Sequence, residues 1–202
     1  MDIYIMYRPQ LSAKNTVILY DAVHTVAFHA HKINADPTLG SKLQELGPMV
    51  QMQDPPLLRL ENESYQMCLT FLQNLAIDKP PTYEESVVES YLVDLCEEVL
   101  LLYIEIACSG QMIPESSPGG PHNWSIPLGS GKRRELAARA PLIVATLQAI
   151  CSLGDSLLEK NMACFLPLLS SLISCEHGSN EVQLALREML SLSVGPILLQ
   201  SC

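Results

Sequence analysis

Apolar residues recur at intervals of three and four along most of the chain, which is the spacing of one face of an α-helix. The most regular stripe consists of Leu92, Leu95, Val99, Leu102 and Ile106. Acidic residues lie mostly on the other side of this predicted helix, and Thr82 and Glu85 form the T-x-x-E pattern of a capping box at its start. No segment alternates with the two-residue period of a strand for long enough to predict one, so the pattern favours an all-α fold.

The same periodicity predicts helices earlier in the chain, at about residues 11–33, 37–47 and 57–77. Pro- and Gly-containing turns separate them. Their expected buried stripes are Leu19, Val23, Val26 and Ala30 in the first of these helices, and Tyr65, Leu69, Leu72 and Leu75 in the last.

Residues 109–131 interrupt the helical pattern with four Pro, five Gly and five Ser. A stretch so rich in residues that break helices indicates a linker. We therefore expect a helical repeat region at 1–108, a linker at 109–131, and a C-terminal helical region at 132–202.

Helical stripes return in the C-terminal region, where Pro141 is expected to kink or restart the first helix. Ser179 or Asn180 is expected to cap the last helix. The predicted buried positions are Leu136, Ala140, Ile143, Leu147 and Ile150, then Leu158, Met162, Phe165, Leu169 and Leu172, and finally Val182, Leu186 and Met189.

Residues 165–190 have the form of a HEAT repeat, with Pro167 inside the first helix, a polar turn, and a second helix that opens on Val182. The Arg that usually follows this Val is Gln183 here. Paired helices, short turns and mid-helix Pro together predict a HEAT/armadillo-like α-solenoid of antiparallel helix hairpins, in which each hairpin buries its face against its neighbours.

Composition narrows the class of partner. The chain has 202 residues, 48% of them apolar, and a net charge of -10, which argues against nucleic acid or an anionic membrane as the main partner. Its longest apolar run, roughly 99–104, is far shorter than the ~20 residues that span a bilayer, so no transmembrane segment is expected. Seven Cys without a C-x-x-C pair, and a start that does not resemble a signal peptide, indicate free thiols in a reducing compartment.

Three constellations suggest chemistry, and each is incomplete. The sequence GSGKR at 129–133 lacks the Gly and the Ser or Thr of a phosphate-binding loop. His24, His29 and His31 do not have the i, i+4 spacing of helical zinc ligands. Cys175 and His177 lack a nearby orienting group for a thiol–imidazole pair. We therefore predict no catalytic, cofactor-binding or metal-ligating residue and no enzymatic activity.

Two features are candidate contact sites. Residues 80–131 carry eight acidic residues and no Lys or Arg, and then Lys132, Arg133 and Arg134 follow as a block. Cations oppose the dipole at a helix start, so the block is a candidate contact for phospholipid headgroups or another acidic surface; a solvated first turn is the competing interpretation. Trp124 either anchors the linker or docks a partner.

The acidic residues before the linker allow a similar pair of interpretations. They form either a solvated helix face or a docking face for a basic partner. These residues are Glu84, Glu85, Glu89, Asp94, Glu97 and Glu98.

Three long stretches, at 11–34, 41–75 and 132–190, resemble the C-terminal part of the large brefeldin-A-inhibited guanine-nucleotide exchange factors for Arf GTPases, especially the plant members. The most specific segments are DPPLLRLENESYQ and ISCEHGSNEVQLAL. The resemblance covers nearly the whole chain.

This resemblance implies a helical-repeat module downstream of the catalytic exchange domain, in the cytosol or peripherally on trans-Golgi and endosomal membranes. The module would regulate recruitment, autoinhibition or dimerisation through Arf GTPases or other segments of the exchange factor. The family's catalytic glutamate motif has no counterpart here, so no catalytic residue is carried over. The start within IYIMYR resembles the end of a family helix, which suggests a gene fragment, a truncated gene model or a stand-alone remnant. The competing interpretations of function are a nonfunctional gene fragment and a small Cys- or His-dependent helical enzyme.

Overall fold

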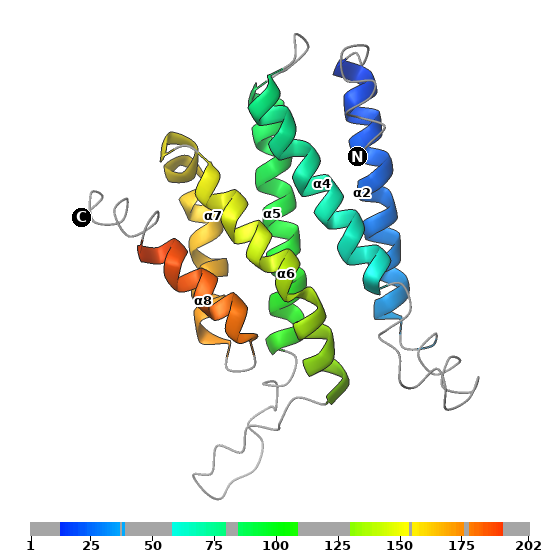
Figure 1. Ribbon diagram of the computed structural model, residues 1–202, viewed down its shortest axis with the longest axis vertical. Coiled ribbons are helices and arrows are strands. Elements are labelled where there is room, and N and C mark those ends of the chain that lie inside the picture. The colour runs from blue at the N-terminus through cyan, green and yellow to red at the C-terminus, as the bar shows by residue number, and fades with distance from the viewer. Residues whose placement is uncertain are drawn as a thin grey trace, which may run out of the picture. The chain divides into compact units, whose positions relative to one another are not determined.

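The computed structural model describes residues 13–36, 38, 58–79, 85–108, 130–153, 155–175 and 178–191. Every regular element among them is a helix (Figure 1), which confirms the predicted all-α class. The helices are α2 (Ala13–Ala35), α4 (Leu58–Asp78), α5 (Glu85–Cys108), α6 (Ser130–Ser152), α7 (Asp155–Ser174) and α8 (Asn180–Met189). None of these helices is long and apolar enough to cross a membrane.

The chain forms two compact units, Met1–Cys96 and Glu97–Cys202, and the boundary between them falls inside α5. The first unit contains α2, α4 and the N-terminal half of α5. The second contains the rest of α5 together with α6, α7 and α8.

In the first unit, α2 packs against α4. The predicted stripe of α4 is confirmed, because Tyr65, Leu69, Leu72 and Leu75 are all at most 3% exposed. Tyr20 of α2 also meets Tyr91 of α5, with ring centroids 5.0 Å apart.

The predicted stripe of α2 is partly wrong. Val26 is 44% exposed, whereas Tyr20, Ala27 and Ala30 form the buried face. The apolar residues of α2 lie on several sides of the helix, so their periodicity could not identify the face that packs. Small side chains at Ala27 and Ala30 allow the close approach of a neighbouring helix.

In the second unit, the predicted stripe of α6 is confirmed, since its five members are at most 1% exposed: Leu136, Ala140, Ile143, Leu147 and Ile150. The helix begins at Ser130, so Ser130 and Gly131 belong to it and not to the predicted linker. Pro141 does not restart it, because α6 runs through this exposed residue without a break. The remaining linker residues, 109–129, lie outside the described part of the chain.

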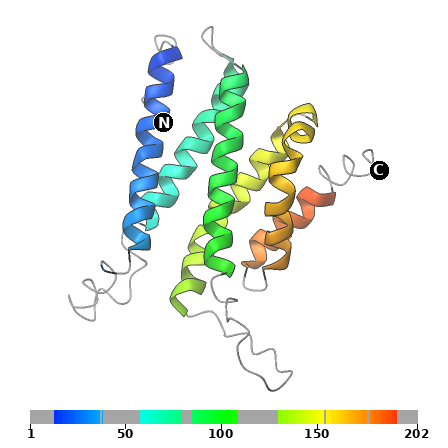
Figure 2. The same ribbon diagram turned by 180° about the vertical axis from the view of Figure 1, so that it is seen from behind.

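Helices α7 and α8 form a hairpin in the second unit. Figures 1 and 2 show α6 and α8 in one layer, with α7 and the C-terminal part of α5 in the other. This layered hairpin is the local arrangement expected of a helical repeat. Of the predicted core positions of α7 and α8, Met162 is only half-buried. The other seven are buried: Leu158, Phe165, Leu169, Leu172, Val182, Leu186 and Met189.

Side-chain hydrogen bonds define the turn between α7 and α8. Ser179 is the N-cap of α8, as predicted, and its hydroxyl accepts a bond from the amide of Glu181 at 3.3 Å. Gln183 donates from Nε2 to the carbonyl oxygen of Leu172 at 2.9 Å. Gln183, which stands where HEAT repeats usually carry Arg, thus satisfies a carbonyl in the last turn of α7.

Candidate interaction surfaces

The basic block lies on the surface of the second unit. Lys132, Arg133 and Arg134 follow Ser130 at the start of α6, and all three are exposed. The next cation of the helix, Arg139, is only 2% exposed and pairs with Glu135 at 3.1 Å. The three exposed cations are therefore accessible, and a contact with an acidic surface stays a prediction. Trp124, the other predicted contact residue, lies outside the described residues.

The three histidines of α2 have three different surroundings. His24 stacks on Tyr20 at a centroid distance of 5.7 Å, and His29 Nδ1 lies 2.8 Å from the carbonyl oxygen of Thr25. His31 reaches α4 instead. The structure does not bring the histidines together, and its described residues hold no group of three or more His, Cys, Asp or Glu side chains suited to a metal ion.

A buried carboxylate joins α2 to α4. Glu61 is 0% exposed, and its two oxygens lie 3.1 Å from Nδ1 of His31 and 2.7 Å from Nδ2 of Asn34. A buried carboxylate needs such partners, because leaving it unpaired costs several kcal/mol. Sequence reasoning missed this cluster, although Glu61 stands four residues before Tyr65 and so shares its buried face.

Cys175 does not have the properties of an activated nucleophile. Its Sγ lies 3.6 Å from Sγ of Cys108 in the second unit. The pKa of the Cys175 thiol is raised to about 12. Burial is the largest cause, and the hydrogen bond with Cys108 and the charge of Cys108 act in the same direction. The thiol is therefore protonated at neutral pH, whereas a nucleophilic Cys needs a lowered pKa. His177, its predicted partner, lies outside the described residues.

The predicted acidic face of α5 is only partly described. Glu84 lies outside the described residues, and Glu85 pairs with Lys79 at 3.0 Å on the surface. Asp94 is exposed, and Glu97 is half-buried. An ion pair between side chains that are both about 60% exposed contributes little to stability. The choice between a solvated face and a docking face for a basic partner stays a prediction.

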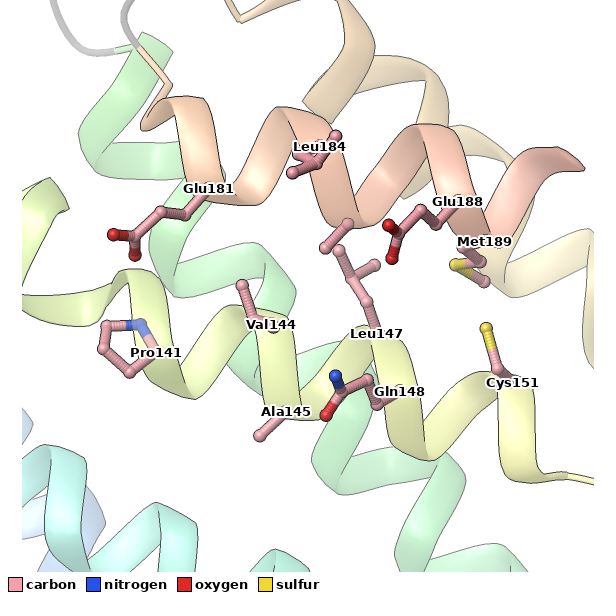
Figure 3. A pocket seen from close by; sticks show the side chains of 11 residues that line it. Pro141, Val144, Ala145, Leu147, Gln148, Cys151, Glu181, Leu184, Glu188 and Met189 are labelled. Carbon is pink, nitrogen blue, oxygen red and sulfur yellow. The ribbon is translucent and has the colours of Figure 1, made fainter. Parts of the chain in front are cut away.

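A groove of about 600 Å³ lies between α6 and α8 in the second unit. Figure 3 shows its apolar centre, to which α6 contributes Val144 and Leu147 and α8 contributes Leu184. Glu181 and Glu188 also line it. Sequence reasoning missed the groove because Leu184 lies off the buried stripe of α8, and only its apolar character among polar neighbours could have pointed to it.

The comparisons with family models and with known proteins indicate the same family. The model of the BIG2 C-terminal domain matches residues 1–191. The chain is 66% identical over 206 residues to brefeldin A-inhibited guanine nucleotide-exchange protein 2 of Arabidopsis thaliana, a match that covers 100% of this chain and 12% of that protein. It is 54% identical to exchange protein 3 of the same plant, covering 100% of this chain and 11% of the relative. No solved structure matches the chain.

Proposed function

The chain belongs to the BIG2 C-terminal domain family, and from this we propose that it is a non-catalytic regulatory and interaction module of an Arf guanine-nucleotide exchange factor. The observation that carries the proposal is the family match over residues 1–191. The relatives are named as guanine nucleotide-exchange proteins, and the chain spans only about 12% of their length. Exchange on Arf GTPases is thus proposed for the whole protein, and regulation of that exchange for this chain.

The surfaces of the second unit suit a module that works by contact. It presents a basic block at Lys132, Arg133 and Arg134 and an apolar groove between α6 and α8. Its Cys175 thiol is buried and has a raised pKa, which does not fit Cys175 as the nucleophile of a Cys- or His-dependent enzyme. We propose that the partners are Arf GTPases or other segments of the exchange factor, and that the module acts in the cytosol and peripherally on trans-Golgi or endosomal membranes in vesicle traffic.

The proposal is tested with an Arf protein loaded with fluorescent GDP. The chain alone should leave nucleotide release at its spontaneous rate. Added in trans to exchange protein 2 of Arabidopsis from which the matching C-terminal segment has been deleted, it should change either the exchange rate or recruitment to liposomes.

Each outcome of this test bears on the proposal. Faster release by the chain alone would show that it is catalytic. Two results together would show that the segment is not a regulatory module and would favour the nonfunctional fragment. The first is that the chain added in trans changes neither the exchange rate nor recruitment. The second is that the exchange protein without the segment has the same exchange rate and recruitment as the intact protein.

A further inference from the structure

The groove between α6 and α8 has an apolar floor that the described residues leave open. Leu184 of α8 lines this groove and is 60% exposed. Small residues, Ala145 of α6 and Ala185 of α8, add to the lining and leave the centre hollow. An exposed apolar surface rimmed by polar groups is typical of a site that binds another molecule.

The shape of the groove favours a helix as its occupant. Its lining extends from Pro141 to Cys151 along α6 and from Glu181 to Met189 along α8. At about 1.5 Å per residue, these walls are on the order of 12–15 Å long, or two to three helical turns. A trough between two helices accepts the apolar face of a third helix, as in other helix-in-groove complexes.

The charge of the rim favours a basic helix. Glu181 and Glu188 are both exposed, both line the groove, and stand on either side of Leu184 in α8. None of the described residues that line the groove is Lys or Arg. Two turns of helix separate the carboxylates, a distance of about 10 Å. Lys or Arg residues at the same separation on a partner helix would meet both carboxylates.

We propose that this groove binds an amphipathic helix of a partner protein, in which an apolar residue lies between two Lys or Arg residues seven positions apart. The inference rests on the proposed function in that the chain acts through protein contacts, and it specifies the chemistry of the partner. The acidic rim disfavours anionic lipid headgroups, which would be repelled by Glu181 and Glu188.

The probe is a designed Ala-rich helical peptide with one Leu between two Lys residues at this spacing, labelled with a fluorophore. Its binding to the full chain is measured by anisotropy. A peptide of the same composition with scrambled spacing is the control for non-specific attraction to an acidic protein. The matched-spacing peptide should bind at least ~10-fold more tightly, since apolar and charged contacts form together only in that register.

Variants of the chain locate the site. Leu184→Asp should weaken peptide binding ~10-fold or more, because it places a charge at the apolar centre. Ile173→Asp is the matched control, since Ile173 of α7 is 53% exposed but does not line the groove. Both positions are exposed, so circular dichroism of both variants should match that of the native chain.

A charge swap gives the sharpest test. Glu181→Lys with Glu188→Lys should abolish preference for the Lys peptide and create preference for the same peptide with Glu in place of Lys. The control pair is Glu105→Lys with Glu159→Lys, which reverses two exposed charges of the second unit outside the groove and should leave the preference unchanged.

Several results would overturn the proposal. These are no binding of the matched peptide, equal binding of the scrambled peptide, binding that survives Leu184→Asp, or a preference that does not switch with the charge swap. A native dimer that Leu184→Asp converts to a monomer would identify a second copy as the occupant instead. Failure of the proposed function and failure of the groove proposal are distinguishable. If the chain catalysed nucleotide release from Arf, the proposed function would be refuted, whereas binding of the matched peptide would still support the groove.

Discussion

The backbone amide of Ser179 donates a 2.8 Å hydrogen bond to the phenolic oxygen of Tyr103. This bond ties the turn before α8 to the C-terminal half of α5, across 76 positions of sequence. Tyr103 is 0% exposed, and burial raises the pKa of its hydroxyl although the bond from Ser179 acts in the opposite direction. The N-cap of α8 is thus held by its own helix and by a buried side chain from another helix.

Tyr103→Phe should therefore destabilise the chain. It removes the acceptor of the Ser179 amide while keeping the aromatic ring, and a lost hydrogen bond of this kind costs about 1–2 kcal/mol. Urea unfolding followed by circular dichroism measures the change. Tyr91→Phe is the control, and an equal loss of stability there would show that the Tyr103 bond is not the cause.

Glu61→Ala should be among the more damaging single changes in the first unit. It leaves His31 and Asn34 without the carboxylate that joins α2 to α4, and removing one partner of such a buried cluster costs about 3 kcal/mol. The same unfolding experiment measures it. Glu63→Ala is the matched control in α4, because Glu63 pairs with Arg59 on the surface and its loss should change little. Similar losses of unfolding free energy for Glu61→Ala and Glu63→Ala would contradict the prediction that the buried carboxylate contributes more than the exposed one.

The Cys96 thiol should make stability depend on pH in the alkaline range. Burial raises its pKa from 9.0 to about 12, so the folded state holds the proton more tightly than the unfolded state. This contribution is fully present below pH 9 and is lost as pH rises toward 12, by up to about 1.4 kcal/mol per pH unit. Unfolding of Cys96→Ala at several pH values should show a shallower alkaline loss than the native chain. Cys164→Ala, at an exposed position, should keep the native slope.

Gly178→Ala should weaken the turn between α7 and α8. An added Cβ would lie 3.2 Å from Nε2 of Gln183, so that side chain must move by a few tenths of an ångström, which strains its bond to Leu172. We expect a loss of about 1 kcal/mol in the free energy of unfolding. In a Gln183→Ala background the same change should cost less, since both the close contact and the strained bond are already absent.

Gly131→Ala is the control for this prediction. A Cβ at Gly131 meets nothing within 4 Å, and the residue lies inside α6. Ala favours a helix over Gly by up to about 1 kcal/mol, so this change should be neutral or stabilising. A destabilising Gly131→Ala would count against the helix start at Ser130.

Replacing Lys132, Arg133 and Arg134 together with Ser should weaken binding of the chain to acidic liposomes. Each cation near an anionic membrane contributes roughly 1 kcal/mol, so the three together correspond to about a hundredfold in affinity. Raising the salt concentration should reduce native binding in the same way. Arg187→Ser, an exposed cation of α8, is the control. If the triple variant bound as tightly as the native chain and salt had no effect, Lys132, Arg133 and Arg134 would be interpreted as a solvated first turn of α6.

Local patterns in the sequence were sufficient to predict the described helices and the family, whereas the helix predicted at about 37–47 lies almost entirely outside the described residues. The stripes of α4, α6 and α8 follow from spacings of at most four residues, because neighbours on a helix face are set by the helical repeat itself. The same pattern predicted a cap for α8 at Ser179 or Asn180, and the structure has it at Ser179. The resemblance to the brefeldin-A-inhibited exchange factors is confirmed by the family match over residues 1–191. The pattern was wrong at Val26, where a helix with apolar residues on several sides offers more than one face to its neighbours.

Only the tertiary structure shows which distant residues meet. His31 and Glu61 are 30 positions apart, and Cys108 and Cys175 are 67 apart. The groove likewise needs α6 and α8 side by side before Leu184 gains its apolar surroundings and Glu181 and Glu188 become a rim. Helical periodicity assigns residues to a face of one helix, but the choice of partner helix depends on how side chains from separate segments pack, and that choice is made in three dimensions.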